Sequence, residues 1–130
     1  MSDQNVALLE GIYERWSQGD FRTEAAYGEQ FSVELGPEFP DSGVHAGLEG
    51  VAAYTKGFLD PWERITITAE EMIDGEDKVL VRVLQSGTGR SSGIAVELRY
   101  FHLWSFDGTT PARMASIMEE ADALARLGRG

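Results

Sequence analysis

The stretch Ile94-Ala-Val-Glu-Leu-Arg-Tyr-Phe-His-Leu-Trp-Ser-Phe106 decides the fold of this chain. When it is read with a period of two, every second residue falls on the same side of an extended strand. One side then carries Ile94, Val96, Leu98, Tyr100, His102, Trp104 and Phe106. The pattern predicts a long strand with one apolar face that holds a single imidazole among aromatic rings. Such a face lines either a packed core or a cavity.

Helical periodicity dominates the chain before this strand. Apolar residues recur at spacings of three and four over residues 5–18, which predicts an amphipathic helix. A short second helix is expected over residues 21–26, with Asp20 as its N-cap. A short strand at residues 31–35 and a loop rich in turn residues come next, followed by a helix through residues 48–58.

The second half of the chain has the alternation and the turn signals of a meandering sheet. Strands are expected at residues 65–69, 79–84 and 112–118, on either side of the long strand. A last helix is expected at residues 119–127, with Ala121, Leu124 and Ala125 on one side. Helices followed by an antiparallel meander are typical of the α+β class, with the helices packed on one face of the sheet.

Composition narrows the function classes. The 130 residues suit one domain spanning residues 1–130, and no linker or repeat divides them. With no cysteine and two histidines, the chain offers no thiolate and no ready metal site, so neither metal nor cofactor is expected. A net charge of −11 argues against nucleic acid and against anionic membranes. The start Met-Ser-Asp-Gln-Asn lacks the features of a signal peptide, so a cytoplasmic protein is expected.

Three motifs occur together in a familiar order. They are Trp16-Ser-Gln-Gly-Asp20, Gly47-Leu-Glu-Gly-Val-Ala-Ala-Tyr54 and His102-Leu-Trp-Ser-Phe-Asp-Gly108. In this order and spacing the chain resembles the NTF2-like superfamily, which includes ketosteroid isomerase, scytalone dehydratase, limonene-epoxide hydrolase and the SnoaL-like polyketide cyclases. The resemblance covers nearly the whole chain. It implies a cone-shaped α+β fold in which N-terminal helices pack on a curved, mainly antiparallel sheet.

The catalytic residues of two of these enzymes do not carry over. The general-base aspartate of ketosteroid isomerase falls at about Leu35, and its tyrosine donor falls on Ile12, with Tyr13 one step around the helix. Only its acidic oxyanion donor meets a polar residue here, His102. The essential aspartate of limonene-epoxide hydrolase meets the stretch Met114-Ala-Ser-Ile-Met118. Neither mechanism therefore transfers to this chain.

The resemblance nevertheless implies a cavity on the His102 side of the long strand. His102, Tyr100 and Tyr54 are the candidate catalytic residues. Candidate ligand-binding residues are Trp16, Phe58, Trp104, Met114, Ser116 and Met118. The first hypothesis is a protein that binds a small hydrophobic molecule. The alternative is an isomerase, dehydratase or cyclase that moves a proton on a hydrophobic carbonyl substrate, so whether the chain is an enzyme stays open. His102 can also be a core histidine bonded to a tyrosine or to the backbone.

The opposite side of the long strand carries a different expectation. Glu97 and Arg99 lie there and favour cross-strand ion pairs. Phe101 and Leu103 continue that side and would leave apolar area exposed, which favours a homodimer through this face. His45 is expected in an exposed loop between glycines.

Overall fold

The computed structural model describes residues 2–128. Three helices, α1 (Ser2–Trp16), α2 (Gly47–Leu59) and α3 (Glu120–Leu127), surround one sheet. Its strands are β1 (Ser32–Leu35), β2 (Gly43–Ala46), β3 (Trp62–Asp74), β4 (Lys78–Gly89), β5 (Ala95–Asp107) and β6 (Thr110–Ile117). They lie in the order β2-β1-β6-β5-β4-β3. Neighbouring strands are antiparallel except β1 and β6, which run parallel.

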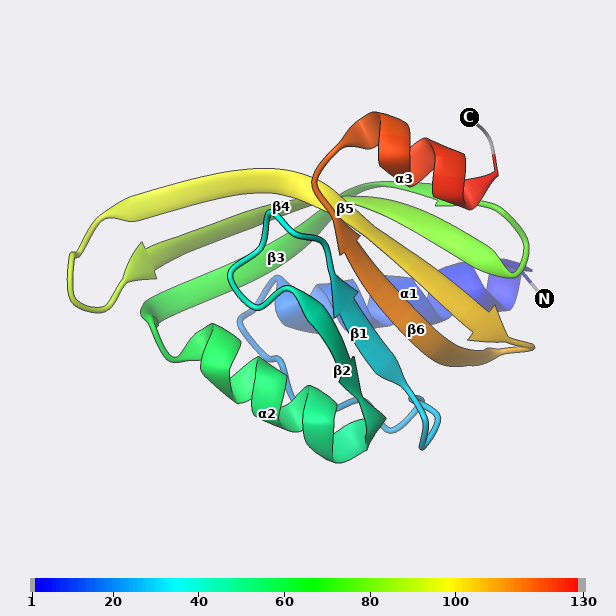
Figure 1. Cartoon of the computed structure of the whole chain (residues 1–130), viewed down its shortest axis with the longest axis horizontal. Helices are drawn as coiled ribbons and strands as arrows, with labels where there is room; N and C mark the ends of the chain where they lie inside the picture. Colours follow the sequence, from blue (N-terminus) through cyan, green and yellow to red (C-terminus); the bar gives the residue numbers. More distant parts are fainter. Residues whose placement is uncertain (1, 129–130) are drawn as a thin grey trace.

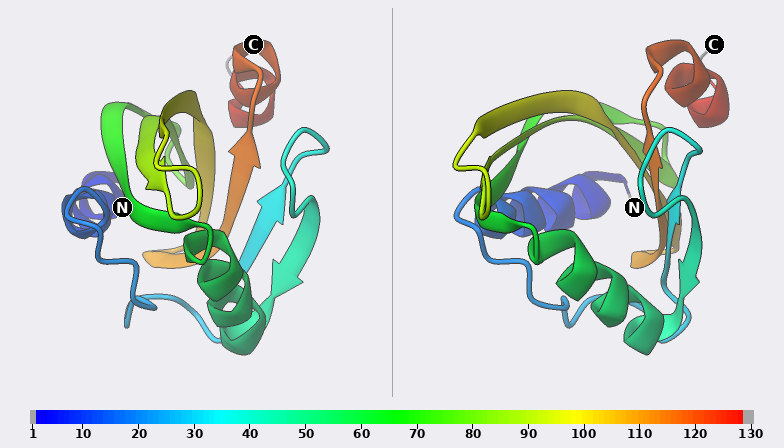
Figure 2. Two further views of the ribbon diagram at one scale, coloured as in Figure 1. Left: turned by 90° about the vertical axis from the view of Figure 1, so that its left-hand side faces the viewer. Right: turned by 60° about the vertical axis from the view of Figure 1, so that its left-hand side comes forward.

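The sheet is strongly curved and encloses its helices like half a cone (Figures 1 and 2). Helices α1 and α2 lie on the concave side, whereas α3 lies on the convex side (Figure 2). Contacts follow the same division, because α1 packs on β3, α2 on β1 and β2, and α3 on β4, β5 and β6. The predicted α+β fold, with N-terminal helices on a curved and mainly antiparallel sheet, is confirmed. The expectation that all helices pack on one face is wrong, because α3 covers the convex side (Figure 2).

Strand β5 agrees with the predicted strand to within one residue at each end. Tyr100, His102 and Trp104 are buried on its concave side, where they meet α1. Phe101 and Leu103 are buried on its convex side. There they pack with residues of α3, so the second half of β5 is covered on both faces.

Because α3 covers Phe101 and Leu103, these residues leave no exposed apolar area that would favour a dimer through the convex face. Phe101 and Leu103 are 7% and 3% exposed within a single chain, because α3 already packs on them. Arg99 makes the expected cross-strand ion pair, with its Nε 3.0 Å from Glu70 Oε1. Such solvent-exposed pairs contribute little to stability, because water screens the charges. A homodimer stays a prediction that no longer rests on this apolar area.

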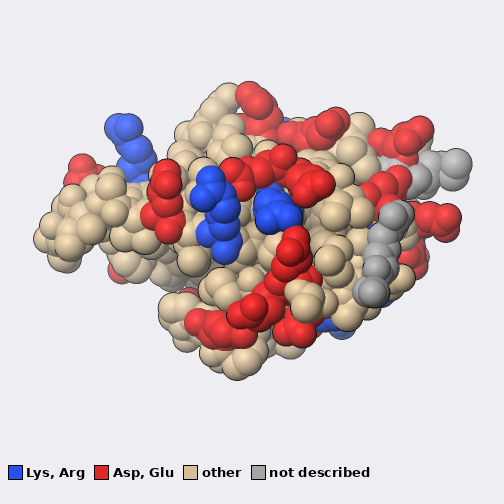
Figure 3. Space-filling model, turned by 90° about the horizontal axis from the view of Figure 1, so that it is seen from above, with Lys and Arg blue, Asp and Glu red and all other residues tan. Residues whose placement is uncertain are grey.

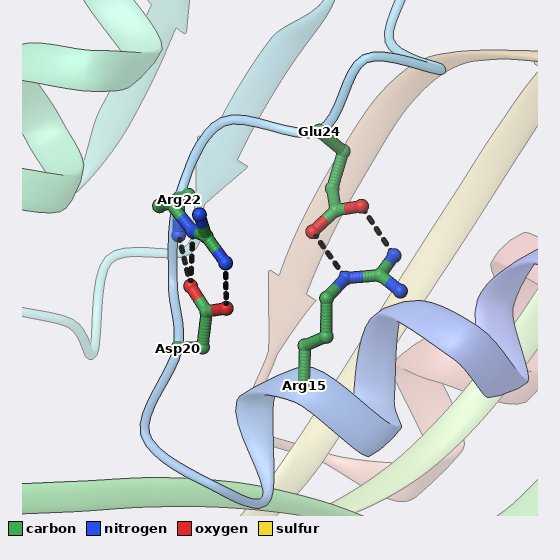
Figure 4. Close-up of polar contacts among 4 residues, drawn as sticks. All are labelled: Arg15, Asp20, Arg22 and Glu24. Atoms are coloured by element: carbon green, nitrogen blue, oxygen red, sulfur yellow. Dashed lines mark hydrogen bonds and ion pairs between the residues drawn. The ribbon is translucent and has the colours of Figure 1, made fainter.

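The predicted short helix at residues 21–26 is wrong. Asp20 accepts hydrogen bonds from the backbone N–H and the guanidinium of Arg22, and Glu24 pairs with Arg15 of α1 (Figure 4). These bonds join neighbours two residues apart or tie the segment to α1, instead of capping a helix. The segment consequently runs as irregular chain from α1 toward β1.

Two further details differ from the prediction. Strand β2 replaces part of the expected loop, and His45 on it is half-buried, with its ring 4.9 Å from that of Tyr54. Helix α3 buries Ala123 and Leu127, whereas Ala121 and Ala125 are exposed. The helix therefore packs on the sheet with a different set of residues than predicted, and these residues contact the cluster on the convex side that includes Leu80 and Ile117.

Acidic and basic side chains lie side by side on the face seen in Figure 3. Among the ion pairs of the molecule, the Arg82 guanidinium pairs with Glu71 and Glu120 and lies 5.2 Å from the ring centre of Phe101. Among residues 2–128, no helix is long and apolar enough to cross a membrane. Within the same residues, no cluster of three or more histidine or acidic side chains is placed to hold a metal ion.

Candidate ligand-binding site

A tyrosine from α1 joins two side chains of β5 in the centre of the molecule. The Tyr13 hydroxyl lies 2.8 Å from Trp104 Nε1 and 2.6 Å from His102 Nδ1. An indole N–H can only donate, so the Tyr13 oxygen accepts from Trp104. The Tyr13 hydroxyl proton is then free to be donated to His102 Nδ1. This arrangement satisfies the indole N–H, the Tyr13 hydroxyl and imidazole Nδ1, and it leaves the proton of the neutral imidazole on Nε2.

His102 is almost completely buried, and this burial decides its charge. Loss of hydration lowers the pKa of the imidazole from 6.5 to about 3. The ring is therefore neutral at physiological pH. A neutral imidazole with its proton on Nε2 is a hydrogen-bond donor, and a much weaker base than the near-neutral group expected from the sequence.

A narrow cavity of about 50 Å³ lies between the concave side of the sheet and the helices. Its lining includes seven of the predicted residues: Trp16, Tyr54, Phe58, Tyr100, His102, Met114 and Ser116. Since Nδ1 is bonded to Tyr13, Nε2 is the imidazole nitrogen available to this space. Among the described residues that line it, none is an aspartate or a glutamate.

Ser116 provides a second polar group beside His102. The two residues face each other in the register of β5 and β6, and Ser116 is 4% exposed. Within residues 2–128, neither the Ser116 hydroxyl nor His102 Nε2 has a protein hydrogen-bond partner. Both groups can therefore bond to a polar atom that enters the cavity.

The two tyrosines predicted as catalytic differ in how firmly they are held. Tyr100 donates its hydroxyl proton to Gln85 Oε1 at 2.7 Å, and burial raises the pKa of its phenol. Burial, with a smaller contribution from Asp41, raises the pKa of Tyr54 to about 12. The Tyr54 hydroxyl has no hydrogen-bond partner among the described residues. Both phenols stay protonated at neutral pH, so each can donate a hydrogen bond but neither is a base.

Trp104 and Met118 are not among the residues that line the cavity. Trp104 is fully buried and packs between Trp16 and Phe31, so it belongs to the core beneath the cavity. Met118 follows the last residue of β6 and is half-buried. Strand parity places both residues on the correct side of the sheet, but the cavity does not extend over that whole side.

Some lining residues were missed in the sequence. Phe21 and Arg22 come from the irregular segment that was expected to be helical, Tyr27 follows that segment directly, and Phe31 precedes β1. Tyr13 was noted only as a neighbour of the expected donor position. Its place on the apolar stripe of α1 was a signal that its side chain faces the sheet.

Comparisons with known proteins agree on the fold. A family model described as a SnoaL-like domain matches residues 9–113. An NTF2-like protein of unknown function from Burkholderia pseudomallei is 16% identical, with a TM-score of 0.77 over 94% of this chain and 95% of that one. A putative SnoaL-like polyketide cyclase from Jannaschia is 13% identical, with a TM-score of 0.75 over 99% of this chain and 94% of that one.

A third similar structure was determined with a small molecule. It is TerC, co-crystallised with polyporic acid, and it is 15% identical, with a TM-score of 0.76 over 96% of this chain and 98% of that one. Identities this low show a shared fold alone. The comparison with curated proteins gave no match.

Proposed function

This chain belongs to the SnoaL-like domain family, and from that premise we propose that its cavity binds a small hydrophobic molecule that carries a carbonyl group. The observation behind the proposal is the bonded series from Trp104 through Tyr13 to His102, which leaves an N–H donor facing an aromatic space. Ser116 adds a hydroxyl next to it. Apolar walls with a few polar groups are the usual composition of small-molecule sites.

A carbonyl oxygen fits the polar groups better than a cation does. His102 Nε2–H offers a donor, and the Ser116 hydroxyl can add a second donor to the same acceptor. A cationic ligand would find no carboxylate in the described lining, and burying an unpaired charge is costly. The polyporic acid bound by TerC supports an organic ligand for a site in this fold.

The test compares two ligands of the same shape. Octan-2-one and 2-methyloct-1-ene differ only in that a C=O group replaces a C=CH₂ group. We expect the ketone to bind about tenfold more tightly, the value of one net hydrogen bond of about 1.4 kcal/mol. Isothermal titration calorimetry, or quenching of the summed tryptophan fluorescence, would measure both. Equal affinities, or saturable binding of neither, would overturn the proposal.

The alternative is an enzyme of the isomerase, dehydratase or cyclase type. One observation favours it, because a buried neutral donor such as His102 Nε2–H stabilises negative charge that develops on a carbonyl oxygen. Proton abstraction also needs a base, however. The cavity lining described above has no carboxylate, and the low pKa of His102 makes it a poor proton acceptor.

Deuterium exchange separates binding from proton transfer. When the protein is mixed with octan-2-one in ²H₂O, NMR follows the loss of the hydrogens next to the carbonyl. We expect no acceleration over buffer, because no base of suitable pKa lines the cavity. Accelerated exchange that saturates with ketone, and that is lost in His102→Asn, would favour the enzyme instead.

A further inference from the structure

The cavity beside His102 is too small for a whole ligand. Its volume is about 50 Å³, whereas sites for drug-sized molecules usually enclose at least about 300 Å³. A carbonyl and its nearest carbon atoms fill a space of this size. The rest of the ligand must therefore lie elsewhere, unless the core expands.

A second, larger space adjoins this inner cavity. It is a groove of about 320 Å³ between the end of α2, the loop after β1 and the first half of β5. Trp62, Val96 and Leu98 form part of its lining. Val96 and Leu98 are 44% and 37% exposed, which is unusual for apolar residues on the concave side of a sheet.

The two spaces share one wall. Tyr54 and Phe58 from α2, Tyr100 from β5 and Ser116 from β6 line both of them. The concave side of β5 thus runs without interruption from His102 through Tyr100 to Leu98 and Val96. The strand therefore leads from the inner cavity toward the groove, with the side chains of the shared wall between the two spaces.

One part of the shared wall is held by packing alone, without a side-chain hydrogen bond among the described residues. Tyr100 is fixed by its bond to Gln85 and is 4% exposed. Tyr54 and Phe58 are half-buried and one helical turn apart, with ring centres 6.1 Å apart. Among the described residues the Tyr54 hydroxyl has no partner, so turning this side chain breaks no protein hydrogen bond.

We propose that the ligand is an elongated, uncharged methyl ketone or a similar carbonyl compound, with its head at His102 and Ser116 and an unbranched apolar tail in the groove. This inference rests on the proposed function. The tail covers Val96, Leu98 and Trp62, which explains why these side chains are apolar and accessible. Asp41 lines the groove, so a tail that ends in an anion is disfavoured.

A series of ketones of increasing length tests the groove. Hexan-2-one, octan-2-one, decan-2-one and dodecan-2-one carry the same head and differ only in the tail. Burying each methylene contributes about 0.8 kcal/mol, so we expect Kd to fall about fourfold per methylene until the groove is full. Calorimetry would measure the series on the protein of 130 residues.

A matched pair of variants locates the tail. Leu98→Asp places a charge in the groove, while Ile94→Asp makes the same change at a 62% exposed residue outside it. We expect Leu98→Asp to remove the gain with length, so that the four ketones bind with similar Kd. Ile94→Asp should behave like the original protein. Should Leu98→Asp fail to fold, Trp62→Ala tests the same groove from β3.

The outcomes separate the two proposals. If no ketone binds, the proposed function itself fails. If all four ketones bind with the same Kd, the carbonyl site stands and the elongated ligand is wrong. A gain with length that persists in Leu98→Asp would place the tail outside the groove and also contradict the inference.

Discussion

Replacing Tyr13 with phenylalanine is expected to lower the free energy of unfolding by about 3 kcal/mol. The Tyr13 hydroxyl bonds to both Trp104 Nε1 and His102 Nδ1 in the fully buried core. Without it, an indole N–H and an imidazole nitrogen remain buried and unpaired at the same time. Each orphaned group costs about 1 to 3 kcal/mol, which makes this loss large for the deletion of one oxygen atom. Urea unfolding followed by tryptophan fluorescence would measure it.

Tyr27→Phe is the matched control for this change. Tyr27 also packs in the aromatic core, with its ring 4.1 Å from that of Phe31 and 6.2 Å from that of Trp104. Its hydroxyl has no hydrogen-bond partner among residues 2–128, so removal of this oxygen is expected to cost less than about 0.5 kcal/mol. Similar losses of stability in the two variants would show that packing, and not the hydrogen bonds of the Tyr13 hydroxyl, explains the effect.

Tyr13→Phe should also disturb the ligand site. Without the Tyr13 hydroxyl, nothing holds the His102 proton on Nε2, and the two neutral tautomers become closer in energy. We expect the preference for octan-2-one over its alkene analogue to fall several-fold, and the ¹⁵N shifts of the imidazole to move toward a mixture of tautomers. A purely structural role for Tyr13 would change stability and leave the ¹⁵N shifts alone.

Acid should destabilise the protein in a pH range where most carboxylates are still ionised. The folded chain keeps His102 neutral, because burial lowers its pKa from 6.5 to about 3. The unfolded chain takes up this proton below pH 6.5, whereas the folded chain takes it up only near pH 3. Stability is therefore full above pH 6.5 and falls with pH below it, by about 1.4 kcal/mol per pH unit. Between pH 6.5 and 5 the expected loss is about 2 kcal/mol.

Urea unfolding at several pH values from 7.5 to 5 measures this slope. His102→Asn serves as the control, because its side-chain oxygen can still accept from Tyr13 while its amide does not titrate. We expect the variant to be nearly flat over this range. Equal slopes in both proteins would mean that another group takes up the proton, and that His102 is not neutralised by burial.

The sequence was sufficient for most of the sheet, because alternation is a local signal that tertiary contacts reinforced. Strand β5 is an example. The alternation of its residues predicted the strand, and packing of α3 on Phe101 and Leu103 supports it from the convex side. The prediction of secondary structure failed where a polar side chain has two possible hydrogen-bond partners close by in the sequence. Asp20 binds Arg22 instead of capping a helix, and the four-residue strand β2 carries too little pattern to be recognised.

The sequence predicted which side of the sheet lines the candidate site. It did not predict the extent of the cavity on that side. Alternation correctly grouped Tyr100, His102 and Ser116 around one space. It could not show where α1 fills that space. Trp104 lies under α1, and it therefore belongs to the core and not to the cavity lining. It also could not foresee that residues from the irregular segment, such as Phe21 and Tyr27, complete the wall. Those positions depend on how the chain crosses the open end of the cone.

The parallel pairing of β1 with β6 dictates an order of events during folding. Ser32 lies beside Arg113, and Leu35 beside Ser116, so these partners are some eighty residues apart in the chain. The Tyr13 bonds to β5 span a similar stretch. On a ribosome, β1 is made long before β6, so the edge of β1 that pairs with β6 stays open until residues 110–117 are made. Long-range closure of this kind is slow, on the order of milliseconds to seconds, and an unpaired strand edge is a site where partly folded chains associate.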